Sequence, residues 1–257
     1  MNSMLRRVLV PLPAVALFLG LGLGAIEAKK KARKPPEDLP TFMTERGDPV
    51  LLENFDGGAV PEAWKPGLGT WEIEDGALKG VEKAADDHVA TIRTMTGCTD
   101  VIIQFSFMFK GGRVIGLTLN NKDGHVCSMG ITPTGFRVSK DRPRKESEEK
   151  GELLDSTKVE FKEGQWYDIV VEILGNEMLA SISDKKKKLN VRETRLVIHG
   201  SHEGVAKPKT NFGFYAGGVD QAIYYDDVRV WQSKPNKKWK KTQKKLAMLK
   251  EYLKQRK

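Results

Sequence analysis

The chain has 257 residues, of which 39% are hydrophobic and 30% are charged, enough for a good-sized globular core in one or two domains. The formal net charge of +9 is spread unevenly: the first 37 residues carry +5, the last 24 carry +10, and the middle carries −6. An acidic body with basic ends argues against a specific nucleic-acid partner, because basic tails are usually solvated or adhere weakly to anionic surfaces.

The N-terminus has the features of a targeting segment. A positively charged start, MNSMLRR, precedes the uncharged apolar stretch Val8–Ile26, and Ala25 and Ala28 offer small residues for cleavage. We predict a cleaved signal peptide over residues 1–28 and export to the periplasm or the cell exterior. A membrane tether through an uncleaved signal anchor is the alternative. The stretch is long enough to span a bilayer, and KKKARK places more positive charge after it than before it.

The body of the chain begins after a basic, proline-rich linker, residues 29–49. From Val50 onward, short β-rich runs alternate with glycine-bearing turns. The run GTWEIEDGALKG predicts two strands joined by an Asp-Gly turn. The run VIIQFSFMFK alternates, with Phe105, Phe107 and Phe109 on one face, as a half-buried strand does.

The following runs continue the same β-rich pattern as far as AIYYDDVRVW. We expect 101–110 and 113–120 to pair as a hairpin about Gly111-Gly112, which separates Cys98 from Cys127 and leaves two free thiols. The dipeptide Gly175-Asn176 predicts another tight hairpin. About a dozen strands without alternating helices predict an all-β fold, an antiparallel two-sheet jelly-roll sandwich over residues 50–233.

The last segment, residues 234–257, predicts a lysine-rich amphipathic helix. Trp239, Leu246, Leu249 and Leu253 fall on one stripe, and lysines surround it. Such a helix docks on the sandwich, pairs with another helix, or lies on an anionic envelope polymer or membrane surface. The alternative is a helix that frays in solution, because short isolated helices are marginal.

The order of these runs, from NFDGG through GHVCSMGITPTGF to YYDDVRVW, resembles the concanavalin A-like lectin/glucanase superfamily of jelly rolls. Within it, the chain is similar to exported bacterial 3-keto-disaccharide hydrolase domains of planctomycete type. The resemblance spans Val50 to Trp231 and implies a carbohydrate partner at the cell envelope.

The superfamily's family 16 glycoside hydrolases carry a Glu-x-Asp-x-x-Glu strand motif, which no segment of this chain supplies. The sequence therefore leaves three functions open: a saccharide-binding module, a hydrolase or lyase acting on keto-disaccharides, and a structural envelope module with no ligand.

Histidines at strand entries are the first candidates for chemistry. His88 follows Asp86-Asp87 and His125 follows Asp123-Gly124, each where loops present side chains at a rim of the sandwich. A histidine beside a carboxylate such as Asp87 can act as a general base or a metal ligand. A solvated or turn-capping histidine is the alternative. His199 and His202 form a second loop pair that could chelate a metal.

An aromatic and basic platform for a sugar is the second candidate. Trp71, Arg137 and Lys140 combine an apolar ring with polar groups, and Trp64, Trp166 and Phe136 have similar chemistry. Trp71 and Trp166 also begin strands, and burial in the core is the alternative for both.

The third candidate is Asp226 in the last strand. Strict alternation places Asp226 on the inward face with Val228 and puts Asp227 toward solvent. The resemblance implies that this strand lies beside the first one, where related jelly rolls often hold calcium. Asp226, Glu53 and Asp56 would then supply oxygen ligands for a structural Ca²⁺. Hydrogen bonds to Asp226 without a metal are the alternative, and no cofactor is required.

Overall fold

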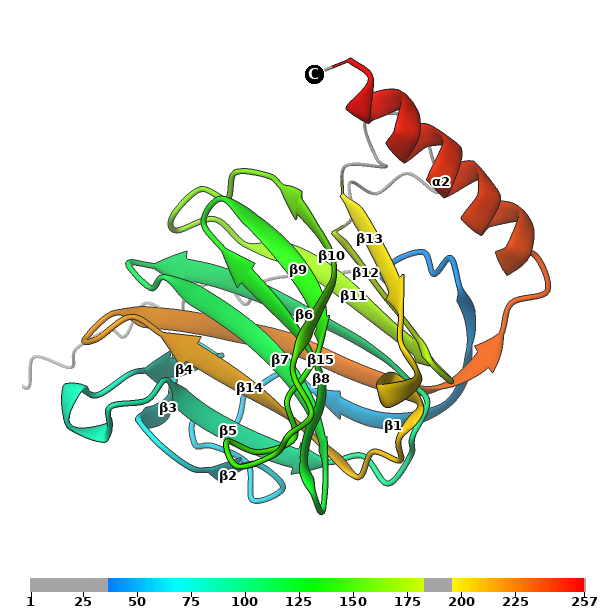
Figure 1. Cartoon of the computed structure of the whole chain (residues 1–257). Coiled ribbons are helices and arrows are strands. Elements are labelled where there is room, and N and C mark those ends of the chain that lie inside the picture. The colour runs from blue at the N-terminus through cyan, green and yellow to red at the C-terminus, as the bar shows by residue number, and fades with distance from the viewer. Residues whose placement is uncertain (1–36, 183–195, 257) are drawn as a thin grey trace, which may run out of the picture. The chain divides into compact units, whose positions relative to one another are not determined.

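The computed structural model describes residues 37–182 and 196–256. The predicted signal peptide and residues 29–36 of the predicted linker lie outside these ranges. The described chain forms two antiparallel β-sheets packed face to face and a C-terminal α-helix (Figure 1). The predicted two-sheet jelly-roll sandwich is confirmed.

The first sheet, sheet A, has eight strands in the order β13-β12-β11-β6-β15-β4-β3, with β1 also paired to β15. Its strands are β1 (Thr44–Glu53), β3 (Thr70–Glu74), β4 (Ala77–Val81), β6 (Val101–Lys110), β11 (Tyr167–Leu174), β12 (Glu177–Ile182), β13 (Val197–Ser201) and β15 (Ala222–Pro235).

The second sheet, sheet B, has seven strands in the order β10-β9-β8-β7-β14-β5-β2. Its strands are β2 (Lys65–Pro66), β5 (Ala90–Met95), β7 (Val114–Asn121), β8 (Gly124–Thr132), β9 (Gly135–Lys140), β10 (Glu152–Lys158) and β14 (Asn211–Gly217). Two short 3-10 helices, η1 (Ala84–Asp86) and η2 (Glu203–Ala206), lie in connections, and α2 (Trp239–Lys254) ends the described chain.

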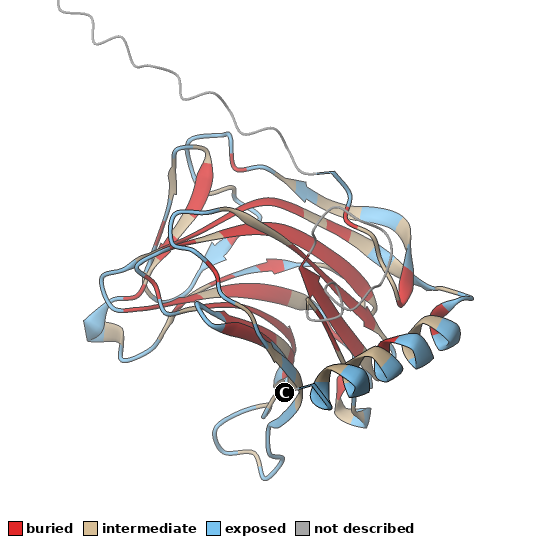
Figure 2. Cartoon of the chain, turned by 90° about the horizontal axis from the view of Figure 1, so that it is seen from above, coloured by how far each residue is buried: buried red, intermediate tan, exposed pale blue. Residues whose placement is uncertain are grey.

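The buried residues gather between the two sheets (Figure 2). Many of these core residues are aromatic. Phe105 and Phe107 of β6 are fully buried, as their alternation predicts. Phe214 stacks on Tyr225 across the sandwich, with ring centroids 4.2 Å apart. Such pairs contribute ~0.5–1.5 kcal/mol each beyond burial, so this cluster holds the two sheets in register.

Three turn predictions can be compared with the structure. β3 and β4 pair around Asp75-Gly76, and β11 and β12 pair around Gly175-Asn176, as predicted. The predicted hairpin about Gly111-Gly112 is wrong, because β6 belongs to sheet A and β7 to sheet B. A Cβ at Gly112 would lie 2.4 Å from Ile223 Cγ1, so this glycine permits a close crossover between the sheets. Cys98 and Cys127 are both free thiols, as expected.

A bulge in β15 overturns the predicted faces of the last strand. Asp227 has a φ of 51°, and the register of β15 with β6 shifts between Asp226 and Arg229. Core side chains stand on both sides of this bulge, namely Ile223, Tyr225, Val228 and Val230. Asp226 therefore does not point into the core but faces outward beside its register partner Ser106. Asp227 is not on the solvent side either, since it is only 4% exposed.

The C-terminal helix α2 docks on sheet A through the predicted stripe. Trp239 and Leu246 are buried against Leu179 and Val197. Trp239 Nε1 donates to Glu177 Oε2 at 2.9 Å, and Lys250 forms an ion pair with Asp155. Of the outcomes that the sequence left open, docking on the sandwich is the one observed. No helix in the described ranges is long and apolar enough to cross a membrane.

Candidate functional site

The outer face of sheet A is covered by the chain itself. Residues 37–44, which we call the strap, cross this face and lead into β1, which begins at Thr44. The carboxylate of Glu172, fully buried on β11, accepts backbone hydrogen bonds from Phe42, Met43 and Thr44 at 2.7–2.9 Å. Burial raises the pKa of the Glu172 carboxyl, while these hydrogen bonds act in the opposite direction. Part of the predicted linker, 37–49, thus belongs to the fold.

The outer face of sheet B carries a groove of about 830 Å³. Its lining comes from β2, β5, β7, β8 and β14 and from the segments before β5 and after β9. We call this the sheet B groove, and its polar or titratable lining residues are Lys65, His88, Thr91, Arg93, Thr118, His125, Ser128, Asp141, Arg142 and Tyr215. A groove with an apolar sheet beneath it and several polar groups above it is the usual form of a small-ligand site.

Small residues in adjacent strands give the groove its depth. Tyr215 of β14 is the direct partner of Gly116 on β7, and Gly116 is the partner of Gly130 on β8. A Cβ at Gly116 would lie 1.7 Å from Tyr215 Cζ, so the phenol ring lies flat over this glycine. Two residue pairs further along the strands, and so on the same face, Gly213 and Thr118 are partners. The floor is therefore a tyrosine ring surrounded by residues with small side chains.

His125 is the best-defined titratable group in the groove. Its Nδ1 lies 2.6 Å from Asn120 Oδ1 and 3.1 Å from Thr118 Oγ1. The amide oxygen can only accept, so Nδ1 carries the proton and Nε2 is the basic nitrogen of the neutral ring. Burial lowers the pKa of His125, Arg93 and His88 lower it further, and Asp141 opposes them. The ring is therefore neutral at neutral pH.

Asp141 is the carboxylate on the same side of the groove. Ser128 Oγ donates to Asp141 Oδ1 at 2.7 Å. Burial raises the pKa of Asp141, whereas the serine hydrogen bond and His125 lower it. Burial also raises the pKa of Tyr215 to about 12, with Asp141 adding to the effect, so the phenol stays protonated. The groove thus contains a neutral base, a carboxyl group and a hydroxyl donor.

The predicted histidine pair meets in this groove, but without its predicted carboxylate. His88 and His125 both line the cavity. His88 Nδ1 lies 2.8 Å from the Val89 carbonyl oxygen, which orients its ring. Asp87 is exposed, in a left-handed turn with a φ of 47°, and is not among the lining residues. Asp141 takes the place expected of Asp87, because the loop after β9 reaches the groove from a distant part of the sequence.

Only one member of the predicted sugar platform lies on this face. Arg137 is exposed on β9, paired with Gly130, beside the groove. Trp71 is buried instead and donates through Nε1 to the Leu68 carbonyl at 3.1 Å. Its ring packs over Gly80, which has no side chain to block it. Trp71 therefore takes the core placement that the sequence left as its alternative.

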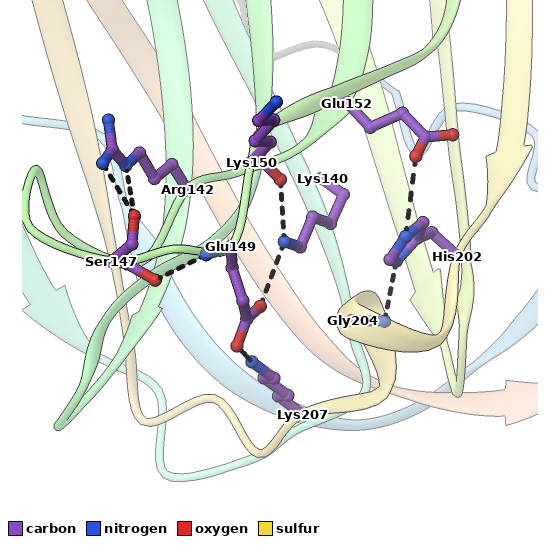
Figure 3. Close-up of polar contacts among 9 residues, drawn as sticks. All are labelled: Lys140, Arg142, Ser147, Glu149, Lys150, Glu152, His202, Gly204 and Lys207. Carbon is purple, nitrogen blue, oxygen red and sulfur yellow. Dashed lines mark hydrogen bonds and ion pairs between the residues drawn. The ribbon is translucent and has the colours of Figure 1, made fainter.

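Lys140 also lies outside the groove lining. It is 5% exposed, and its Nζ donates to Glu149 Oε2 at 3.0 Å and to the Lys150 carbonyl at 2.9 Å (Figure 3). Glu149 also forms an ion pair with Lys207 at 2.6 Å. Lys140 thus anchors the loop 141–151, whose first residues border the groove.

The first and last strands, β1 and β15, pair as the resemblance implied, but the predicted metal ligands form no three-residue group. The described ranges contain no group of three or more His, Cys, Asp or Glu side chains that could hold a metal ion. Glu53 accepts from the Phe55 N–H at 2.9 Å, and Asp56 accepts from Asn54 Nδ2 at 2.6 Å. Asp226 accepts from the Asp227 N–H at 2.7 Å. The structural Ca²⁺ therefore stays a prediction, and we derive nothing through it.

The second histidine pair serves two separate places in the structure. His199 Nε2 lies 3.2 Å from Glu177 Oε1, and its ring packs edge-on against Trp239 of α2. His202 Nδ1 instead accepts the Gly204 N–H at 2.8 Å and so caps η2 (Figure 3). The two rings have different partners, and we assign no shared ligand to them.

Sequence reasoning missed Arg93, Thr118, Ser128, Asp141 and Tyr215. A signal was available in the run NFGFYAG, where Phe212, Phe214 and Ala216 are buried and the other face carries Asn211, Gly213 and Tyr215. Alternation of large apolar residues with glycine and polar residues marks a strand with one face packed and one face lining a depression.

No family model and no curated protein sequence matches the chain. Solved structures do match. The carbohydrate-binding module CBM66 of Bacillus subtilis has 13% identity and a TM-score of 0.51, with 66% of this chain and 96% of that chain covered. The CBM2 module of the evolved Dit of Lactobacillus casei BL23 phage J-1 has 10% identity and a TM-score of 0.54, with 76% and 99% covered.

A Bacillus subtilis protein of unknown function with a galectin-like fold has 12% identity and a TM-score of 0.51, with 76% of this chain and 100% of that chain covered. Identities this low establish similarity of fold alone. The fold class of the chain is therefore that of the jelly-roll and galectin-like sandwiches.

Proposed function

We propose that the chain is an exported, carbohydrate-associated module that binds a saccharide in the sheet B groove. The observation that carries this proposal is the sheet B groove itself. It has a volume of about 830 Å³, a tyrosine ring on its floor, and hydroxyl, imidazole and guanidinium groups around it. Sugars present apolar ring faces and many hydroxyl groups, which match such a surface. The fold shared with a carbohydrate-binding module of Bacillus subtilis supports the same reading.

The opposite sheet supports the choice of this face. The strap and α2 cover much of the outer side of sheet A, where they bury Glu172 and Leu179 completely. A ligand there would have to displace segments held by buried hydrogen bonds, at a cost of ~1–3 kcal/mol for each group left unsatisfied. The sheet B groove demands no such rearrangement.

The test is a glycan screen by thermal shift and calorimetry on the chain and on Tyr215→Ala. Removing the ring from the groove floor should weaken saccharide binding about tenfold, the loss of one ring contact of ~1.5 kcal/mol. Tyr252→Ala is the matched control, since Tyr252 lies on α2 and is 41% exposed. Binding that is equally strong in both variants would place the saccharide elsewhere, and a panel without any binder would refute the proposal.

A second candidate function is hydrolysis or elimination on a keto-disaccharide or related glycoside. The observation that favours it is the pairing of His125, a neutral base with a lowered pKa, with Asp141, a carboxyl with a raised pKa, in one groove. A histidine that can accept a proton and a carboxyl that can donate one, placed in one groove, can divide the general base and general acid roles. His125→Asn should then abolish turnover while binding persists, whereas His202→Asn should retain turnover.

The tail supports a further element of this proposal, attachment to an anionic envelope surface. With Trp239 and Leu246 facing the sandwich, exposed lysines such as Lys241, Lys244 and Lys245 remain on the outer side of α2. Each lysine near an anionic surface adds ~1 kcal/mol of attraction at low ionic strength. Replacing these three lysines with glutamine should reduce sedimentation with anionic vesicles, and an unchanged sedimented fraction would count against the idea.

A further inference from the structure

Two cations face each other across strands at one wall of the sheet B groove. Lys65 of β2 and Arg93 of β5 are direct register partners, so their side chains leave the same face of the sheet. Both residues are exposed and both line the groove. Like charges in this position destabilise a sheet. A neighbouring carboxylate would provide compensation for this repulsion.

That compensation is missing within residues 37–182 and 196–256. Neither the Lys65 ammonium nor the Arg93 guanidinium forms a hydrogen bond or an ion pair with a described residue. Some other exposed cations do have acidic partners: Lys207 pairs with Glu149 at 2.6 Å and Arg113 with Glu82 at 3.5 Å. Lys65 and Arg93 differ from these two pairs, because no described carboxylate compensates their charges.

A second cavity extends the same charge along the sheet. It encloses about 390 Å³ and shares Arg93, His125 and Arg142 with the first. The Arg142 guanidinium donates to the Ser147 carbonyl at 2.7 Å and 2.9 Å (Figure 3). Arg144 donates to the Lys122 carbonyl at 2.8 Å. These neutral partners fix both arginines in place without cancelling their charge.

The charge of the groove opposes that of the body around it. Five lysine and arginine side chains, all cationic at neutral pH, line the two cavities, namely Lys65, Arg93, Arg142, Arg144 and Lys145. The only carboxyl groups in the two linings are Asp141 and Glu146. Residues 38–233 as a whole carry −6. A concave positive surface in an acidic body focuses its field on the groove and attracts anions there.

We infer that the groove takes an acidic saccharide, one bearing carboxylate or sulfate groups, and that Arg93, together with Lys65, binds the anionic group. This inference rests on the proposed saccharide binding and specifies its substrate class. A guanidinium forms two parallel hydrogen bonds with a planar carboxylate or with two oxygens of a sulfate ester, and an ammonium adds a point charge. The anion would also remove the repulsion between the paired cations.

The experiment measures binding of matched charged and neutral sugars by calorimetry. Trigalacturonate is compared with its neutral methyl ester, and a sulfated galactan oligosaccharide with its desulfated form. We expect at least one acidic sugar to bind about tenfold more tightly than its neutral partner, the size of one charge-assisted hydrogen bond. The advantage should shrink in high salt, and the pair that shows it identifies the anionic group as carboxylate or sulfate.

Variants then locate the charge. Arg93→Gln should weaken binding of the acidic sugar about tenfold and leave the neutral sugar within about twofold. Arg256→Gln is the matched control, because it removes the same net charge at an exposed residue beyond α2. Since Arg93 is itself exposed, its replacement leaves the core intact, and an unchanged melting temperature verifies this.

The outcomes separate the inference from the function beneath it. Neutral sugars that bind as tightly as acidic ones, or equal effects of Arg93→Gln and Arg256→Gln, would overturn the inference and leave saccharide binding standing. If no sugar of either kind binds, both are overturned.

Discussion

The contact between Gly116 and Tyr215 gives the sharpest test of how the groove is built. A Cβ at position 116 would lie 1.7 Å from Tyr215 Cζ and 1.9 Å from Cε1, far inside van der Waals contact. Gly116→Ala must therefore drive the phenol ring off the floor. Overpacking of this kind costs ~1–3 kcal/mol. Alanine in a strand interior gains ~0.5–1 kcal/mol over glycine, so we expect a net loss of up to ~2.5 kcal/mol.

Urea unfolding of four proteins measures this coupling: the chain itself, Gly116→Ala, Tyr215→Ala and the double variant. With the ring removed, the clash disappears, and Gly116→Ala should become neutral or stabilising by up to ~1 kcal/mol. Gly130→Ala is a milder control, since its Cβ would meet the Tyr215 hydroxyl at 3.0 Å. An equal cost of Gly116→Ala with and without the tyrosine ring would refute the reasoning about the floor.

Three further predictions concern segments that frame the groove or cover the other sheet. Glu172→Gln should cost ~1–3 kcal/mol, because the amide group cannot accept all the strap's N–H groups. Burial raises the pKa of Glu172 in the folded protein, so its protonation stabilises the fold below the pKa of the unfolded chain, and this stabilisation is lost as pH rises through the folded pKa. The melting temperature should therefore depend less on pH, between pH 4 and 8, in Glu172→Gln than in the unchanged chain. An identical pH dependence in both proteins would contradict this. Trp239→Ala should lower the free energy of unfolding by ~3–5 kcal/mol and make the lysines of α2 more susceptible to trypsin. Met248→Ala, at a site 73% exposed, should change stability by less than ~0.5 kcal/mol. Equal digestion rates for the two variants would show that Trp239 does not hold α2 on the sheet. Lys140→Met should increase the rate of amide hydrogen exchange in the loop 141–151, because it removes the hydrogen bonds to Glu149 and to the Lys150 carbonyl. Lys207→Met, which removes an exposed ion pair with Glu149, should leave that rate unchanged. Similar exchange rates in the two variants would mean that the hydrogen bonds of Lys140 do not hold the loop.

The core of the sandwich and the tail helix were predictable because they depend on local periodicity. Alternation in β6 placed Phe105 and Phe107 correctly, and the Asp75-Gly76 turn was read from two residues. The same rule failed in β15, where a bulge at Asp227 shifts the alternation by one residue. A bulge depends on what the partner strands require, and its signal in a single strand is weak.

The candidate site was predicted in part. His88 and His125 were singled out as strand-entry residues, and both line the sheet B groove. Asp141, Arg93 and Tyr215 were missed, because each sits on a different strand or loop and only the order of strands in sheet B brings them together. Lys140 was misplaced because a charged residue on a strand reads as exposed, whereas here its charge is neutralised by Glu149 within the fold.

The sequence by itself determined the class of the molecule: strands from alternation, turns from glycine and asparagine or aspartate, a lysine-coated helix from its apolar stripe, and an acidic body between basic ends. These features follow from the preferences of neighbouring residues and need no knowledge of the rest of the chain. Tertiary structure alone decided which sheet face remains open. The strap and α2 cover the outer face of sheet A. On sheet B, glycines on neighbouring strands let the Tyr215 ring lie flat, so the outer face keeps an open groove. That choice depends on contacts between residues far apart in the sequence, such as Phe42 with Glu172, 130 positions away, which no local pattern encodes.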